Sequence, residues 1–171
     1  PAEADAMYAG IVIDTNNFMN QAGVRTFEAA AFLRRNGADV VRVRKLFRDR
    51  LEDYRARAEA IQKAEIYHGA FAISVCPSEG LESPTVDGAQ AANEVLAIVG
   101  IKASCLLTQM GDTIYFSARS IDEINVQIIM ERLGGGGHRT IAGAQLKGAT
   151  IDEAREKLKD LITDMMEKGE I

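Results

Sequence analysis

The chain has 171 residues and a formal net charge of -5, with 47 % apolar and 26 % charged residues. This mixture is typical of a globular domain, and no apolar run is long enough to span a bilayer. Net acidity argues against nonspecific binding to duplex nucleic acid. Cys76 and Cys105 are too few for a disulfide framework or a thiolate metal site, so we expect buried free thiols. Because the first residue is proline, we expect a piece of a longer protein.

Residues 1–38 contain one predicted strand and one predicted helix. Residues 9–13 are a short apolar run that predicts a buried strand, and the polar residues 14–17 follow its carboxyl end. Residues 27–36 predict a helix that stops at Gly37. Since a lone strand cannot bury its faces, we expect this β-α unit to be the C-terminal remnant of a larger domain.

A single long helix is predicted over residues 39–66, and we expect it to link two domains. Apolar residues recur there at spacings of three and four, as in an amphipathic helix; they are Val43, Phe47, Leu51, Tyr54, Ala58 and Ile61. Residues 34–57 hold nine Lys or Arg against four Asp or Glu. We favour a solvated basic face there over a nucleic-acid surface.

The remaining residues, 67–171, predict a compact domain of mixed secondary structure. The expected strands cover residues 69–76, 103–109, 113–118 and 141–146, and the middle two form a hairpin. The expected helices open at Ser83-Pro84 and at two capping boxes, Ser120/Glu123 and Thr150/Glu153. This order predicts an α/β (α+β) fold, in which a mixed β-sheet is flanked by helices.

The run Gly134-Gly135-Gly136-Gly137 is followed directly by His138 and Arg139. Glycine loses more backbone entropy on folding than any other residue, so four in a row require a sharp turn or a close ligand. The run leaves a helix C-terminus and therefore is not a P-loop. Its N–H groups could still form an anion-binding concavity, and a plain tight connection is the alternative.

Arg119 lies at the carboxyl end of a predicted strand. It alternates with Phe116 and Ala118 and therefore leaves on the polar face of that strand, next to Ser120. The forked donors of arginine suit a phosphate, and Asn125 could point the same way. A solvated arginine is the alternative, but together with the Gly/His segment a joint anion site is favoured.

Asp14 is the one candidate metal ligand. A carboxylate followed by Thr15, Asn16 and Asn17 could bind a hard cation, although a turn cluster of the same residues is an equally simple explanation. His68 has no nearby partner in the sequence, and we interpret it as structural.

Four segments together resemble the C-terminal part of the DHH/DHHA1 phosphoesterases, in particular the cyclic-di-AMP phosphodiesterases. They are residues 9–18, residues 23–30, the Ser117-Ala118-Arg119-Ser120 motif and residues 134–138. The resemblance covers essentially the whole chain. It implies an end of a DHH domain in residues 1–38, a linker helix in 39–66 and a DHHA1 domain in 67–171.

The resemblance also implies roles for the candidate residues. Members of this family cleave phosphodiester bonds with two Mn²⁺ ions, and of their metal ligands only Asp14 has a counterpart here. Arg119 and the backbone of Gly135–Gly137 would hold a phosphate, and His138 would contact the substrate beside the scissile bond. Ser120 and Asn125 are further substrate-binding candidates. The chain alone should not hydrolyse c-di-AMP to pApA, because it lacks nearly all metal ligands.

The same resemblance implies partners and surroundings for the chain. They are a dinucleotide or short oligonucleotide, a missing N-terminal DHH domain, a possible homodimer, and a membrane-anchored parent protein that acts on the cytoplasmic side. Two alternatives stay open. One is a nanoRNase/pAp phosphatase or a RecJ-like exonuclease, and the other is a non-catalytic nucleic-acid-binding module.

Overall fold

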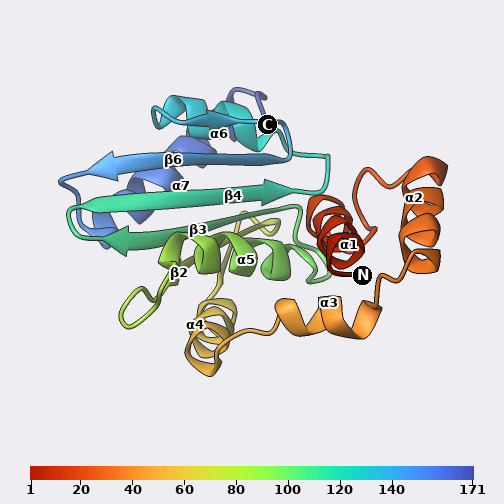
Figure 1. The fold of residues 1–171 in the computed structure, drawn as a ribbon. Coiled ribbons are helices and arrows are strands. Elements are labelled where there is room, and N and C mark those ends of the chain that lie inside the picture. The colour runs from red at the N-terminus through yellow and green to blue at the C-terminus, as the bar shows by residue number, and fades with distance from the viewer. The chain divides into compact units, whose positions relative to one another are not determined.

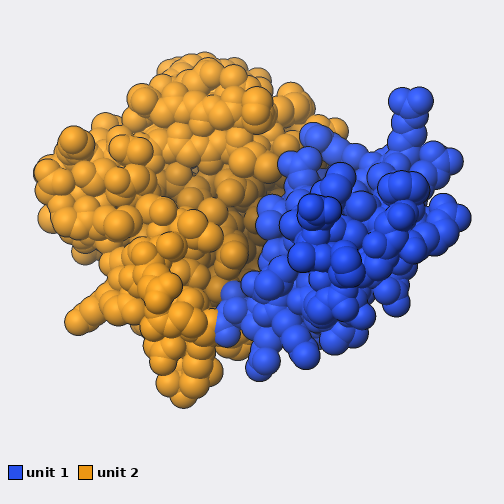
Figure 2. Space-filling model, in the orientation of Figure 1, with its two compact units in different colours: residues 1–49 blue, residues 50–171 orange.

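The computed structural model describes residues 1–171, which divide into two compact units, residues 1–49 and 50–171 (Figures 1 and 2). The first unit is helical, and the second contains the whole β-sheet. No helix in the structure combines the length and the apolar character needed to cross a membrane.

The first unit has three helices, α1 (Ala2–Asp14), α2 (Val24–Arg35) and α3 (Val40–Leu46). Its core is small and consists of Ala4, Leu33 and Ala38, with two partly buried side chains packed against them. The Asp5 carboxylate accepts a hydrogen bond from the Asp39 N–H (2.6 Å) and pairs with the Arg42 guanidinium (2.7 Å). These polar contacts join α1 to the beginning of α3.

The strand predicted over residues 9–13 is wrong, because these residues belong to helix α1. The preceding segment contains three alanines, which favour a helix. A single extended run here would also leave its backbone groups without a partner strand. Asp14 is thus the last residue of a helix and does not lie at the end of a strand.

The single helix predicted over residues 39–66 is also wrong. Helix α3 ends at Leu46, and α4 (Leu51–Gln62) begins five residues later, within the second unit. Phe47 and Leu51, which carry the apolar periodicity across the break, are both exposed. Because no packing surface supports the helix there, α3 packs on α1 while α4 packs on α5 and β2.

The second unit is built on a six-stranded sheet with the order β1-β2-β3-β4-β6-β5 (Figure 1). Strands β2 and β3 are parallel, and every other neighbouring pair is antiparallel. The strands are β1 (Glu65–Tyr67), β2 (Phe71–Cys76), β3 (Ala103–Met110), β4 (Thr113–Ser120), β5 (Gly136–Gly137) and β6 (Ile141–Lys147). The mixed α/β fold class expected from the sequence is confirmed.

Helices cover the two faces of this sheet unequally. One face buries the main core against α6 (Val126–Arg132) and α7 (Ile151–Glu167), with Leu158 and Ile162 fully buried there. The other face packs on α4 and α5 (Pro84–Leu96), and α5 lies over β2, β3 and part of β4. On that second face the side chains of β6 stay accessible: Ile141 is 48 % exposed and Gln145 is exposed. We call the part of this face over β6 and β5, together with the adjoining partly exposed side of β4, the open sheet face.

Several local predictions for the second unit can be compared with the structure. The hairpin between β3 and β4 and the Thr150/Glu153 capping box of α7 are confirmed. The Ser120/Glu123 capping box is wrong, because α6 begins at Val126 with Asn125 as its N-cap. The short strand β1 is not predicted by the sequence, since its three residues carry no clear alternation.

The two cysteines are buried free thiols, as expected. Burial raises the pKa of the Cys76 thiol to about 11 and that of Cys105 to about 12, so both are neutral near pH 7.

Candidate functional site

The sheet register brings Arg119 and His138 to the same end of the sheet. Arg119 on β4 lies opposite Ile141 on β6, and Ile141 exchanges two backbone hydrogen bonds with His138 (2.7 and 3.3 Å). The three residues therefore form one row across the sheet. With neighbouring strands about 4.8 Å apart, the Arg119 and His138 backbones lie about 10 Å apart. The structure therefore places the two predicted motifs at the same end of the sheet.

Arg119 is the one partly buried arginine that no carboxylate neutralises. Three arginines of the chain are buried or partly buried, and the other ten are exposed. Two of the three, Arg57 and Arg155, pair with acidic side chains. The Arg119 guanidinium instead donates to the Asn93 side-chain oxygen (3.1 Å) and to the Ala118 carbonyl (2.8 Å).

Desolvation by burial lowers the pKa of Arg119, although the group stays charged at any ordinary pH. Two of its five N–H groups are used within the protein, so the fork keeps donors for a ligand. A partly desolvated cation with only neutral partners is suited to bind an anion.

Three glycines of the run are required by the fold. Gly134 has φ +82° and follows the last turn of helix α6. The Gly135 N–H then donates a hydrogen bond to the Met130 carbonyl (2.8 Å), which caps this helix end. A Cβ on Gly135 would lie 2.0 Å from the Gly143 carbonyl oxygen, and one on Gly137 would lie 2.5 Å from the Ile141 carbonyl oxygen. These positions are closed to any side chain, so tight packing on β6 explains most of the run.

Gly136 is different, because a Cβ there would meet nothing within 4 Å. It lies opposite Gly143 on β6, and Gly143 lies opposite Ser117 on β4, so all three share a row on the open sheet face. The sheet alone does not require a glycine at this position. A missing side chain does allow a ligand to approach the backbone closely.

Strand β5 is also the edge of the sheet, so part of its backbone has no neighbouring strand. His138 exchanges hydrogen bonds with Ile141, and an antiparallel ladder alternates, so the N–H of Gly137 points away from β6. The glycine segment thus offers a backbone donor beside the row that contains Arg119.

Two other predicted residues lie near this end of the sheet with different roles. Ser120 is the last residue of β4; its hydroxyl is buried and has no hydrogen-bond partner, while its N–H donates to the Thr140 carbonyl (3.0 Å). Asn125 accepts a hydrogen bond from the Gln127 N–H (3.1 Å) as the α6 N-cap. The Asn125 amide NH₂ remains available, but its oxygen is committed to the helix.

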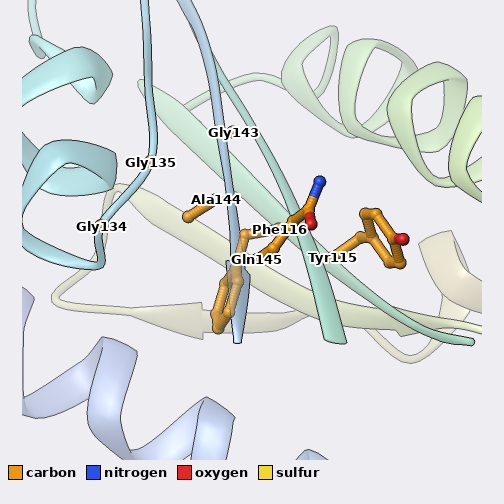
Figure 3. Close-up of a pocket in the computed structure, with 7 residues that line it drawn as sticks. All are labelled: Tyr115, Phe116, Gly134, Gly135, Gly143, Ala144 and Gln145. Carbon is orange, nitrogen blue, oxygen red and sulfur yellow. The ribbon is translucent and has the colours of Figure 1, made fainter. Parts of the chain in front are cut away.

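A pocket of about 340 Å³ lies against the glycine segment (Figure 3). Gly134 and Gly135 form one side, and β4 and β6 form the other. Figure 3 shows Tyr115 and Gln145 leaving the sheet on one side, while Phe116 and Ala144 point to the opposite side. Tyr115 and Gln145 lie opposite each other in the β4–β6 register, on the same face as Arg119.

Asp14 belongs to the helical unit. It is exposed and lies at the C-terminal end of α1, where the helix dipole disfavours a negative charge. With Gln21, Arg25 and Thr26 it helps to line a pocket of about 350 Å³. The following loop is strained, since Asn16, Asn17, Phe18 and Gln21 all have positive φ.

A carboxylate oxygen suits a hard cation such as Mn²⁺, so Asp14 fits a role as one metal ligand. The structure contains no group of three or more His, Cys, Asp or Glu side chains that could hold a metal ion. Asp14 can therefore provide one ligand, and the remaining ligands of a metal centre would have to come from outside the described residues.

Comparison with known proteins identifies the family. Residues 70–164 match the model of the DHHA1 domain. The chain belongs to the DHHA1 family. It is 45 % identical over 171 residues to the cyclic-di-AMP phosphodiesterase GdpP of Geobacillus thermodenitrificans, and 44 % identical over 169 residues to the cyclic-di-AMP phosphodiesterase PdeA of Listeria monocytogenes. Each match covers 98 % of this chain and 25 % of the relative, so the chain spans about a quarter of these proteins.

The fold of the DHHA1 chain is also found in a solved structure. An exopolyphosphatase-related protein from Bacteroides fragilis matches with a TM-score of 0.82, covering 95 % of this chain and 50 % of that one. Sequence identity is 20 %, so this likeness shows the fold. The resemblance expected from the sequence motifs is thereby confirmed at the level of family and fold.

Three further residues in this region were not predicted from the sequence: Tyr115 and Gln145 on the open sheet face, and Asn93 on α5. The alternation along β4 already places Tyr115 on the polar side with Arg119. The pairing of Gln145 with Tyr115 depends on the β4–β6 register, and the contact of Asn93 with Arg119 depends on where α5 packs. Neither is encoded in a local sequence pattern.

Proposed function

We propose that this DHHA1 chain is the substrate-binding part of a phosphodiesterase that hydrolyses c-di-AMP to pApA. Arg119 and the backbone of Gly135–Gly137 hold a phosphate, and His138 lies beside the bond that is cleaved. The observation that carries the proposal is the Arg119 guanidinium, which is partly buried, charged and free of any carboxylate partner.

The chemistry of phosphate recognition supports this assignment. A guanidinium presents a planar fork that matches two phosphate oxygens, and hydrogen bonds between charged groups are about twice as strong as neutral ones. The edge N–H of Gly137 and the bare backbone at Gly136 provide further contact points in the same region. The relatives named as cyclic-di-AMP phosphodiesterases match over 98 % of this chain, which includes these residues.

The metal part of the reaction is a separate proposal. Two Mn²⁺ ions would neutralise the phosphate and activate a water molecule, and Asp14 would contribute one carboxylate to them. Because the chain offers a single ligand, we expect no hydrolysis of c-di-AMP when purified residues 1–171 are incubated with Mn²⁺. Turnover that is abolished by Asp14→Ala would contradict this expectation.

The binding proposal is tested by calorimetric titration of the chain with c-di-AMP. We expect Arg119→Ala to weaken binding at least about tenfold, because a charged hydrogen bond contributes roughly 1.5–3 kcal/mol. Arg119→Lys should restore only part of the loss, since an ammonium lacks the fork.

The matched control is Arg139→Ala, because Arg139 lies directly after His138 but pairs with Asp122 (3.3 Å). This variant should bind c-di-AMP within about twofold of the unmodified chain. Equal affinity of the Arg119→Ala and Arg139→Ala variants would overturn the assignment of Arg119.

The alternative of a nucleic-acid-binding module rests on Arg42, Arg44 and Arg48. The structure disfavours it, because Arg42 is paired with Asp5 and the helix is interrupted after Leu46. This module would predict binding to long RNA that falls steeply with salt and is lost in the Arg44→Ala/Arg48→Ala variant.

A further inference from the structure

Tyr115 and Gln145 are a polar pair on the open sheet face that the proposed phosphate site does not use. They lie directly opposite each other on β4 and β6 and line the same pocket as Gly134, Gly135 and Gly143 (Figure 3). Neither side chain makes a hydrogen bond within the protein, and Tyr115 has no aromatic partner. The Tyr115 ring and hydroxyl and the Gln145 amide are therefore available to bind a ligand in this pocket.

The size of the pocket limits its ligand. About 340 Å³ lies at the lower end of the range of about 300–1,000 Å³ that small-molecule sites occupy. This volume suits one nucleoside rather than a whole dinucleotide. The other half of a dinucleotide would have to lie elsewhere along the sheet.

The distance to Arg119 fits such an arrangement. Tyr115 precedes Arg119 by four residues on the same face of β4, which corresponds to about 13 Å along the strand. That span is of the order of one nucleotide from phosphate to base. The row between them contains Ser117, Gly143 and Gly136, whose side chains are small or absent, so little projects from the sheet there. A sugar could therefore cross this row while its phosphate contacts Arg119.

The chemistry of the pair points to a nucleobase. A partly exposed aromatic ring on a sheet surface can stack with a base, and every base has a π-face to offer. A glutamine amide has one acceptor and a donor group side by side, and this pair matches N6 and N7 of adenine. Guanine presents two acceptors on the corresponding edge and satisfies only half of the amide.

We propose that Tyr115 and Gln145 form the binding site for one adenine base, with Tyr115 stacking on the ring and Gln145 reading its N6/N7 edge. This inference deepens the proposed function and rests on it, because the substrate phosphate is placed at Arg119. It adds what the family assignment does not provide, a set of side chains that select the base.

The test is an NMR titration of the ¹⁵N-labelled chain with pApA and with pGpG, each up to millimolar concentration. We expect the unmodified chain to bind pApA roughly tenfold more tightly than pGpG. Gln145→Ala should abolish this preference, because it should weaken pApA binding much more than pGpG binding. Tyr115→Leu should weaken both ligands about tenfold, and Tyr115→Phe should retain both because the ring remains.

Two controls separate this proposal from the one it rests on. Gln62→Ala removes an exposed glutamine of α4 and should alter neither affinity. Arg119→Ala should weaken pApA and pGpG by the same factor and keep their ratio. The two controls therefore distinguish recognition of the phosphate from selection of the base.

If binding depends on Arg119 but the pApA/pGpG ratio survives Gln145→Ala, the base site is overturned and the phosphate site stands. Loss of the Arg119 effect itself, or no binding of either dinucleotide by the unmodified chain, would overturn both proposals.

Discussion

The two units of the chain are stabilised in different ways. The sheet unit buries a continuous core that includes Leu158, Ile162 and Met165 at 0–1 % exposure. The core cluster of the helical unit has three buried residues, and the unit leaves large apolar side chains accessible, among them Met19 (73 %) and Phe32 (59 %). Its remaining order depends on surface contacts such as the pair between Asp5 and Arg42.

The candidate ligand-binding residues and the candidate metal ligand lie in different units. The proposed phosphate and base sites lie on the sheet, where the register fixes the spacing between side chains. Asp14 lies on the weakly packed unit, at the start of a strained loop. We therefore expect ligand binding to persist under conditions that already unfold the helical unit.

The largest expected effect is a cavity in the core of the sheet unit. Leu158→Ala should lower the free energy of unfolding of that unit by about 2–5 kcal/mol, since Leu158 is fully buried. Leu33→Ala should cost about 2 kcal/mol or less in the helical unit, whose small core can relax. Urea titration followed by amide signals of each unit measures both, and equal losses would contradict the comparison.

A smaller effect is expected from adding a methyl group within the glycine run. Gly135→Ala should destabilise the sheet unit by about 1–3 kcal/mol, because its Cβ would lie 2.0 Å from the Gly143 carbonyl oxygen. Gly136→Ala should leave stability nearly unchanged but weaken dinucleotide binding. Thermal unfolding and calorimetry of the two variants check this, and the assignment fails if Gly136→Ala destabilises as much as Gly135→Ala.

The smallest effect concerns pH. The hydrogen bond from Arg42 and that from the Asp39 N–H hold the pKa of Asp5 below its usual value. A carboxylate with a lowered folded-state pKa stabilises the fold above its unfolded-state pKa, near 3.9, and this contribution is lost as the pH falls through the folded-state pKa. Acid titration should therefore loosen the helical unit below about pH 4, and Asp5→Asn should make this loss shallower.

Local sequence patterns predicted the sheet unit well because its elements carry strong signals. Alternation along β4, the hairpin turn and the Thr150 cap are local features, and each is present in the structure. The wrong predictions arise where packing decides the outcome. The β-branched residues in α1 indicate a strand, but no partner strand lies beside them. The apolar periodicity across residues 47–50 indicates a continuous helix, but no surface packs against the apolar side chains there.

The candidate site shows the same division. Arg119, the glycine run and His138 could be found from residue type and spacing. The sequence could not show why each glycine is needed. Gly135 and Gly137 are required because β6, which follows them in the chain, packs closely against their backbone. The absence of a carboxylate beside Arg119 is likewise a property of the folded chain.

The central claim is that a dinucleotide phosphate binds at the end of the sheet where Arg119 and His138 share a row. Mapping the amide shifts of the ¹⁵N-labelled chain on addition of pApA tests it most directly. We expect the largest changes at Arg119 and residues 135–138, with saturation, and their loss in Arg119→Ala. Changes confined to helix α3, or no saturable change at residues 135–138, would contradict the account.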